Sequence, residues 1–168
     1  MATKKSMWVL FGILVISAWA LGSAIQAGAE TMNYKFYTYV TKGEEVPVGD
    51  VEGHIVRLEV RKSFCVFENG EVATSNGVVT ADFIKFSGPF MQYQTLNFPD
   101  GSTIIWKVQG TFGGASASMK NEILKGTGRF EGIKGTVSAK GKYLQIDKGE
   151  AGMKGYGEGT ITYTLPSK

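Results

Sequence analysis

Few side chains in this sequence could carry out chemistry. Its single histidine is His54 and its single cysteine is Cys65, and the acidic residues are scattered. A transition-metal site needs several His, Cys or carboxylate ligands that converge on one point, so we expect no metal. A serine–histidine–aspartate triad would have to use His54, but no serine lies in a G-x-S-x-G turn. We therefore expect His54 to be a surface residue at a strand end.

Cys65 has no second cysteine with which to form an intramolecular disulfide. We interpret it as a small buried apolar residue. A reactive thiol or an intermolecular bridge is the alternative.

Two glycine clusters resemble phosphate-binding loops at first sight. They are Gly126-Thr127-Gly128 and Gly155-Tyr156-Gly157-Glu158-Gly159. A phosphate loop needs a following helix whose N-terminus meets the phosphate, and no helical pattern follows either cluster. We interpret both clusters as turn and bulge glycines.

Polar and aromatic side chains on one apolar face are the best candidates for a binding site. If the segments 90–98 and 102–110 form a hairpin around Pro99-Asp100-Gly101, Gln94 faces Trp106. Small barrels with ligand cavities are lined by apolar and aromatic groups, with a few polar groups that fix orientation. The candidates for lining such a lumen are Gln92, Gln94, Trp106, Tyr143 and Tyr163. A register shifted by one residue, or glutamines at the barrel mouth, would place them in water instead.

The elements that must position these residues are strands. Segments of alternating apolar and polar residues are bounded by turn signals, and no long helical pattern is present. Asn69-Gly70 and Asn76-Gly77 predict tight turns, and the charged segment 42–50, which contains Pro47, predicts a loop. The predicted strands are 34–40, 51–67, 71–74, 78–86, 90–98, 102–110, 121–126, 136–146 and 155–165.

The second of these strands has two very different faces. Val56, Leu58 and Val60 alternate with Arg57, Glu59 and Arg61. We expect the apolar set to face the core, and the charged set to form a solvated or subunit-facing stripe.

About eight strands in one chain predict an all-β fold. Closure into an antiparallel barrel removes the exposed edges that an open sheet of this size would carry, so we favour a barrel. A sandwich fits the number of strands almost as well.

The first 29 residues differ from the rest. Lys4 and Lys5 precede an uncharged apolar run at 7–21, and Ala27-Gly28-Ala29 has the A-x-A form of a cleavage site. The run is shorter than the roughly 20 residues that span a membrane, although an uncleaved anchor is the alternative. We predict a cleaved signal peptide at 1–29 and a single secreted or periplasmic domain at 30–168, without a stable membrane anchor.

Charge excludes one class of partner. The net charge of +3 for the whole chain includes Lys4 and Lys5, so the domain after the leader is close to neutral. A nearly neutral domain gives no electrostatic reason to expect nucleic acid as a partner.

The segment from Gly126 to Thr136, GTGRFEGIKGT, resembles the G-T-G-x-F-x-x-x-x-G signature of the allene oxide cyclase and dirigent families. The resemblance implies an eight-stranded antiparallel barrel of calycin type, often a trimer, with a largely apolar lumen and no cofactor. It also implies that Phe130 tucks under the barrel end. Those families cyclise an unstable epoxide or steer radical coupling. Their catalytic carboxylates, asparagine and lumen arginine do not map onto this chain residue by residue, so those roles do not transfer.

Three functions are compatible with these features. The first is a secreted barrel that binds a small apolar or aromatic molecule in its lumen. The second is a cofactor-independent cyclase or isomerase that steers a reactive substrate. The third is a structural or interaction protein whose lumen is filled by side chains and whose outer face mediates assembly, for example into a homo-oligomer. A cavity of about 300 Å³ or more favours the first two.

Overall fold

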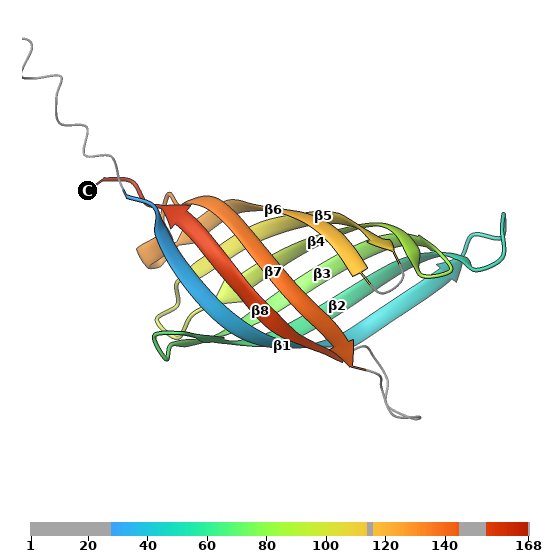
Figure 1. Cartoon of the computed structure of the whole chain (residues 1–168), viewed down its shortest axis with the longest axis horizontal. Coiled ribbons are helices and arrows are strands. Elements are labelled where there is room, and N and C mark those ends of the chain that lie inside the picture. The colour runs from blue at the N-terminus through green and yellow to red at the C-terminus, as the bar shows by residue number, and fades with distance from the viewer. Residues whose placement is uncertain (1–27, 114–115, 145–153, 168) are drawn as a thin grey trace, which may run out of the picture. The chain divides into compact units, whose positions relative to one another are not determined.

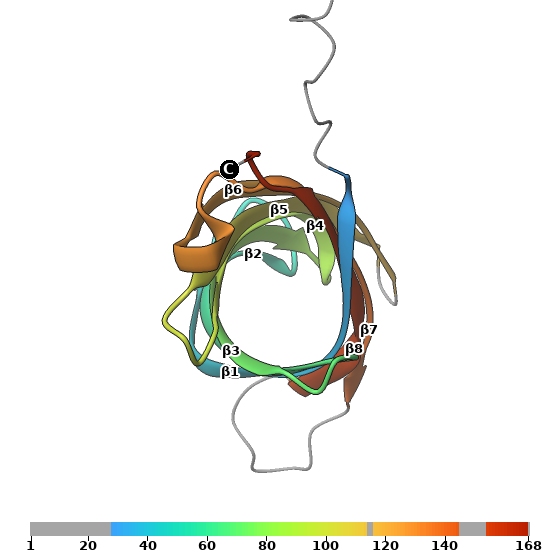
Figure 2. The ribbon, with the colours of Figure 1, turned by 90° about the vertical axis from the view of Figure 1, so that its left-hand side faces the viewer.

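Eight antiparallel strands form a nearly closed barrel (Figures 1 and 2). The computed structural model describes residues 28–113, 116–144 and 154–167, so the predicted signal peptide lies almost entirely outside the described residues. The elements are β1 (Glu30–Pro47), β2 (His54–Phe67), β3 (Val72–Ile84), β4 (Ser87–Asn97), β5 (Thr103–Gly113), β6 (Ser116–Thr127), a 3-10 turn η1 (Gly128–Phe130), β7 (Lys134–Leu144) and β8 (Lys154–Thr164). In the described parts of the chain, no helix is long and apolar enough to cross a membrane.

The strands form one sheet in the order β6-β5-β4-β3-β2-β1-β8-β7. The two edge strands, β6 and β7, are consecutive in the chain and contact each other, which brings the sheet round into a barrel. Figure 2 looks along this ring of strands. The eight-stranded antiparallel barrel implied by the sequence is therefore confirmed.

The β4–β5 hairpin has the predicted register. Gln94 pairs with Trp106 and Gln92 pairs with Val108. The turn is fixed locally, because Gly101 has a φ of 82° and the Asp100 carboxylate accepts a 2.9 Å hydrogen bond from the Ser102 amide.

Two predicted interruptions are absent from the structure. Asn76-Gly77 is not a turn but lies in the middle of β3, where Gly77 pairs with Gln94. A Cβ atom at Gly77 would lie 3.0 Å from Nε2 of Gln92, so the glycine marks a close approach of this side chain. Likewise β1 continues to Pro47 through part of the predicted loop, with a bulge between Val40 and Lys42 that re-aligns it with β2.

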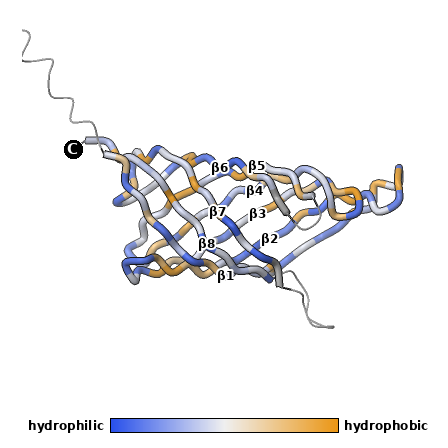
Figure 3. The backbone as a smooth tube through the Cα atoms, viewed as in Figure 1, coloured by the Kyte–Doolittle hydropathy of each residue, from blue (hydrophilic) through white to orange (hydrophobic). Residues whose placement is uncertain are grey.

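The predicted facing of β2 is wrong. Val56 and Leu58 face solvent with about half of their surface exposed (48% and 49%), whereas the Glu59 side chain is 2% exposed. The charged face is the inner one because the guanidinium groups of Arg57 and Arg61 both pair with the Glu59 carboxylate. Alternating polar and apolar residues can be seen along the strands in Figure 3.

A buried aromatic cluster fills one end of the barrel. Phe130 in the η1 turn is 3% exposed, and its ring lies 4.9 Å from that of Phe98 and 6.1 Å from that of Tyr163. Gly126 permits this packing, since a Cβ atom there would lie 2.2 Å from the Phe130 carbonyl oxygen. The prediction that Phe130 tucks under the barrel end is confirmed. The cluster merges with the core, whose fully buried members include Leu96, Ile104 and Ile161.

Candidate ligand cavity

A cavity of about 710 Å³ lies inside the barrel, next to this core. Side chains from all of the strands except β3 contribute to its lining. Its lining combines aromatic rings, aliphatic groups and a small number of polar groups, which is the composition typical of small-molecule sites.

One wall is built from aromatic rings that lie over glycines. Tyr34 and Phe36 on β1 line the cavity, and their neighbours on β8 are Gly159 and Gly157. Cβ atoms at these glycines would lie within 2.8 Å of the Tyr34 and Phe36 rings. The prediction that the Gly155–Gly159 cluster holds turn and bulge glycines is therefore wrong. These glycines lie within β8, and because they carry no side chains the inward face of this strand has room for the rings of Tyr34 and Phe36.

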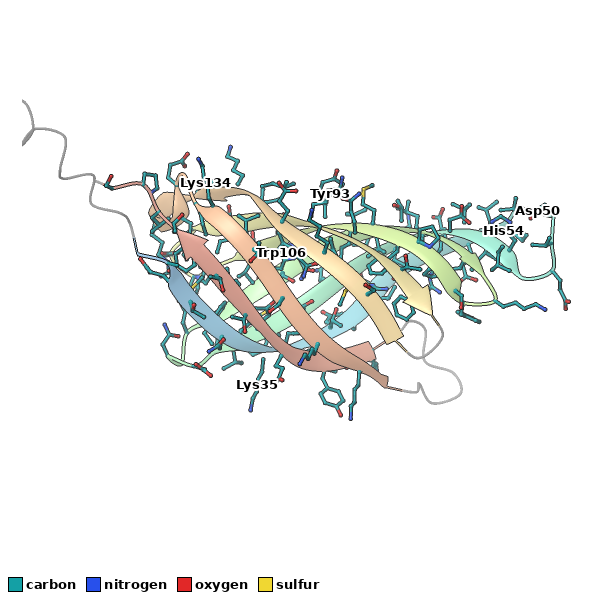
Figure 4. The ribbon with its side chains drawn as sticks, turned by 45° about the horizontal axis from the view of Figure 1, so that its top comes forward. Lys35, Asp50, His54, Tyr93, Trp106 and Lys134 are labelled. Carbon is teal, nitrogen blue, oxygen red and sulfur yellow. The ribbon has the colours of Figure 1, made fainter. Side chains whose placement is uncertain are left out.

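The facing wall carries the predicted amide groups. Gln92 Nε2 donates a hydrogen bond to Gln94 Oε1, and Gln94 Nε2 donates to Ser75 Oγ at 2.6 Å. Trp106, opposite Gln94 on β5, also lines the cavity, and Figure 4 labels it among the side chains in the middle of the barrel. The hydrogen bonds hold both amides in fixed positions, so they present a defined polar surface to a ligand.

A row of charges leads along β2 to the cavity. Arg57 Nη1 lies 2.5 Å from the Glu45 carboxylate, and its other amino group pairs with Glu59. Arg61 holds the same Glu59 carboxylate through Nε at 2.7 Å and Nη2 at 2.6 Å, and Arg61 lines the cavity. Burying Glu59 is tolerated because two cations and these hydrogen bonds compensate for its lost hydration.

Two ionisable groups of the cavity lining are held in their neutral form. Burial, with a smaller contribution from nearby Cys65, raises the pKa of Tyr34 above its ordinary value of 10. Burial also raises the pKa of Cys65 to about 12. At neutral pH both groups keep their protons, so they can donate hydrogen bonds but are poor nucleophiles. Cys65 is 1% exposed, as predicted for a buried residue.

Asn121 supplies an unused acceptor in the same space. It lines the cavity, and its Oδ1 atom is buried without a hydrogen-bond partner within the described ranges. A buried acceptor without a partner carries a desolvation cost that a ligand donor can remove.

The structure brings together only part of the predicted set. Gln92, Gln94 and Trp106 line the cavity. Tyr163 instead packs against Phe130, and its hydroxyl donates a 2.6 Å hydrogen bond to Glu30. Tyr143 pairs through its backbone with Gly155, but its side chain lies outside what the structure describes.

The sequence interpretation missed several lining residues. They are Arg61, Ser63, Phe36 and Asn121, among others. The glycine spacing of β8 is the signal that could have found Phe36, because alternate glycines in a strand indicate large groups packed across them.

A second polar cluster lies away from the cavity, at the first residue of β2. His54 Nδ1 lies 2.5 Å from Asp50 Oδ1, and Nε2 lies 2.7 Å from Asp82 Oδ1. Figure 4 shows His54 and Asp50 at the opposite end of the molecule from Lys134. The hydrogen bonds to Asp82 and Asp50 raise the pKa of His54 above its ordinary 6.5. Among the residues described, no three His, Cys, Asp or Glu side chains are grouped to hold a metal ion.

Comparison with known proteins identifies the architecture. No protein-family description and no curated protein matches the sequence. One similar solved structure is a protein of unknown function from the DUF3224 family of Shewanella oneidensis MR-1, with a TM-score of 0.53, 15% identity, and coverage of 83% of this chain and 100% of that one.

Two further similar structures are the pterocarpan synthase dirigent proteins PsPTS1 and GePTS1. PsPTS1 has a TM-score of 0.51 and 18% identity, with 83% of this chain and 97% of that chain covered. GePTS1 has a TM-score of 0.51 and 17% identity, with 88% and 96% covered. The protein is therefore a dirigent-like β-barrel by fold.

Proposed function

We propose that the barrel binds a small apolar or aromatic molecule in its lumen, without a cofactor. The observation that supports this most is the cavity itself, whose volume of about 710 Å³ lies within the range of small-molecule sites. A lumen with this much space does not fit the alternative of a structural barrel filled by side chains.

The lining supports a ligand with an apolar body and at least one polar group. Tyr34, Phe36 and Trp106 offer aromatic surface. Asn121 Oδ1 offers an acceptor, and the amides of Gln92 and Gln94 are fixed by their own hydrogen bonds. These polar groups would orient the ligand while the rings supply most of the buried area.

We also propose that the protein acts outside the cytoplasm, because the pattern at residues 1–29 is that of a cleaved signal peptide. Ligand uptake would then take place in the periplasm or the medium. N-terminal sequencing of the exported protein should give Glu30 as the first residue. Recovery of the intact chain from the membrane fraction would contradict this proposal.

The binding test uses the single tryptophan of the domain. Once residues 1–29 are removed, Trp106 is the sole tryptophan that remains, and it lines the cavity. Titration with the neutral dye N-phenyl-1-naphthylamine should quench Trp106 and increase dye fluorescence with a saturable curve. Native mass spectrometry of protein from its own host should also show a retained small molecule.

Two neighbouring substitutions on β7 separate lumen binding from surface binding. Ala139 lines the cavity, whereas Ser138 is exposed on the outer face. Ala139→Phe fills part of the lumen and should weaken dye binding by about tenfold or more, because overpacking excludes the dye. Ser138→Phe should leave the binding curve unchanged. Equal curves for the two variants would refute binding in the lumen.

A second function, cofactor-free isomerisation or cyclisation, is favoured by one specific observation. Tyr34 is a neutral phenol in the cavity wall, so its hydroxyl can donate a hydrogen bond to a developing negative charge while the proton itself stays on the phenol, because burial raises its pKa. If this function is correct, the protein should convert a component of its host's small-molecule extract. Tyr34→Phe should abolish the new product while dye binding persists. Conversion at an unchanged rate in Tyr34→Phe would remove this support.

A further inference from the structure

Apolar side chains gather at the connections between β1 and β2 and between β3 and β4. Five of them expose between 47% and 64% of their surface, and they are Val46, Val48, Val51, Ile84 and Phe86. The β1–β2 connection projects beyond the barrel in Figure 1, and Figure 3 shows hydrophobic colour at this projecting end. We call these five side chains the apolar tip. Exposed apolar side chains that gather in one place, unlike scattered ones, mark contact sites.

The two connections that carry the apolar tip are fastened to each other. The Lys85 amide donates a 3.0 Å hydrogen bond to the Gly53 carbonyl, and His54 Nε2 lies 2.7 Å from Asp82 Oδ1. Within the β1–β2 connection, the Val48 amide donates a 3.0 Å hydrogen bond to the His54 carbonyl. The apolar tip is therefore a preformed surface, and contact with a partner requires little further ordering of the chain.

Phe86 has a backbone conformation that is unfavourable for its residue type. Lys85 and Phe86 form the two-residue turn between Ile84 and Ser87, with φ values of 50° and 64°. Such turns ordinarily hold Asn or Gly, because larger side chains are strained in the left-handed region. A ring that is 64% exposed gains little packing in return. Since strained residues gather at functional positions, an external contact explains this ring better than the fold does.

The charged groups of the projecting end are occupied with one another. The ion pairs are Lys42 with Glu44, Arg57 with Glu45, Lys85 with Glu52, and His54 with both Asp50 and Asp82. The carboxylates outnumber the cations, so this end has no excess of positive charge with which to attract an anionic surface. A partner of the apolar tip must therefore be held by apolar contact.

The apolar tip lies at the end of the barrel where the cavity reaches the surface. Because neighbouring strands are antiparallel, β6 begins at the same end of the barrel as β2 and β4. Met119, near the start of β6, lines the cavity and is still 43% exposed. The opposite end is closed by Phe130 and the rings around it.

The shape of the apolar tip suits a lipid surface better than a protein. A protein interface of standard size is built from about 20–30 residues on each side, whereas the tip offers five side chains on two connections. Apolar side chains of peripheral proteins enter the boundary between lipid headgroups and acyl chains to a depth of about 5–10 Å, which a small projecting surface can do.

We propose that the apolar tip docks the exported protein, peripherally and reversibly, on the surface of a lipid bilayer of zwitterionic lipid. Docking would bring the end at which the cavity reaches the surface close to a store of apolar molecules. The proposal rests on the tip and not on binding in the lumen, so either of the two can fail without the other.

Flotation of the exported protein with phosphatidylcholine vesicles tests the proposal. Residues 1–29 are absent from this protein, so their apolar run cannot bind the vesicles. The native protein should float with the vesicles, and high salt should not release it. Phe86→Asn should weaken binding by about tenfold or more, because a large apolar group is removed. Leu124→Asn is the matched control, since Leu124 on β6 is an apolar residue with 47% exposure away from the tip, and it should bind like the native protein.

The fold of Phe86→Asn should be intact, because Asn is better suited than Phe to left-handed backbone. Its melting temperature should equal or exceed that of the native protein, and its dye binding without vesicles should be unchanged. Equal flotation of the native protein and Phe86→Asn would overturn the proposal. Binding that requires anionic lipid and disappears in high salt would overturn it as well, since exposed lysines would then be responsible. A native protein that does not bind vesicles but self-associates through Phe86 would also contradict it.

Discussion

The phenol ring of Tyr34 lies directly over the backbone of Gly159, where a Cβ atom would come within 2.4 Å of its Cζ atom. Tyr34 is a buried core residue on β1, and Gly159 is its partner on β8. Glycine is therefore required at this position by packing across two paired strands, and not by backbone conformation.

Gly159→Ala should destabilise the protein by about 1–3 kcal/mol, because a buried ring would have to leave its place. Urea unfolding measures the loss. Gly113→Ala is the control, since no heavy atom lies within 4 Å of the added carbon. A variant at Gly159 as stable as the one at Gly113 would show that the Tyr34 ring adapts freely.

Phe130→Ala should cost about 3–5 kcal/mol, the range for removing a buried aromatic ring. The ring contacts Phe98 and Tyr163 and closes one barrel end. Lys134→Ala, at the exposed start of β7, should change the free energy of unfolding by less than about 0.5 kcal/mol. Thermal unfolding of both variants gives the comparison. Similar, small losses of stability in Phe130→Ala and Lys134→Ala would mean that the ring contributes little to closing the barrel.

Glu59→Gln should destabilise the protein by about 3–5 kcal/mol, since Arg57 and Arg61 would lose the carboxylate that both contact. Glu44→Gln, on the outer face of β1, should have little effect because its side chain is 66% exposed. Chemical unfolding provides the comparison.

Replacing Arg57, Glu59 and Arg61 together by Met, Leu and Met should recover most of the stability lost in Glu59→Gln, because an apolar set leaves no buried charge unpaired. A triple variant that is no more stable than Glu59→Gln would show that the charged row has no apolar substitute.

The His54 cluster should make stability depend on pH. The raised pKa of His54 means that its contribution is complete below the ordinary value of 6.5 and is lost as pH rises through the higher folded value. The hydrogen bond to His54 lowers the pKa of Asp50 below its ordinary 3.8, so its contribution is present above 3.8 and is lost as pH falls through the lower value.

The difference in melting temperature between the native protein and His54→Gln should therefore be largest between about pH 4 and pH 6.5, and smaller at pH 9. Asp50→Asn should lose part of the same pH dependence. A difference that stays constant from pH 5 to pH 9 would show that His54 does not titrate in this range.

The parts of the fold that local chemistry determines could be predicted from the sequence. The Pro99-Asp100-Gly101 turn sets the β4–β5 register, and this placed Gln92, Gln94 and Trp106 correctly on one face. The glycines around Phe130 likewise indicated a tight turn. Both features depend on residues close together in the chain.

The facing of β2 could not be predicted in the same way. Alternation gives the period of a strand but not which of its faces is inside, and hydrophobicity favoured the wrong face. On the inner face Glu59 pairs with both Arg57 and Arg61, and this pairing is not visible before the strand is placed in the barrel. The turn predicted at Asn76-Gly77 was wrong for a similar reason. The glycine leaves space for the side chain of Gln92 on β4, and that contact cannot be seen from the residues next to Gly77 in the chain.

The line along which β6 and β7 meet, here called the β6–β7 seam, differs from the contacts between the other neighbouring strands. These strands are the two edges of the sheet, so the barrel is completed there by contacts between them and not by a continuous ladder of backbone hydrogen bonds in the described residues. In the described residues, separating β6 from β7 breaks packing contacts but no backbone ladder, whereas separating any other neighbouring pair breaks a ladder. The β6–β7 seam is therefore the line along which the described barrel can open at the lowest cost in backbone hydrogen bonds.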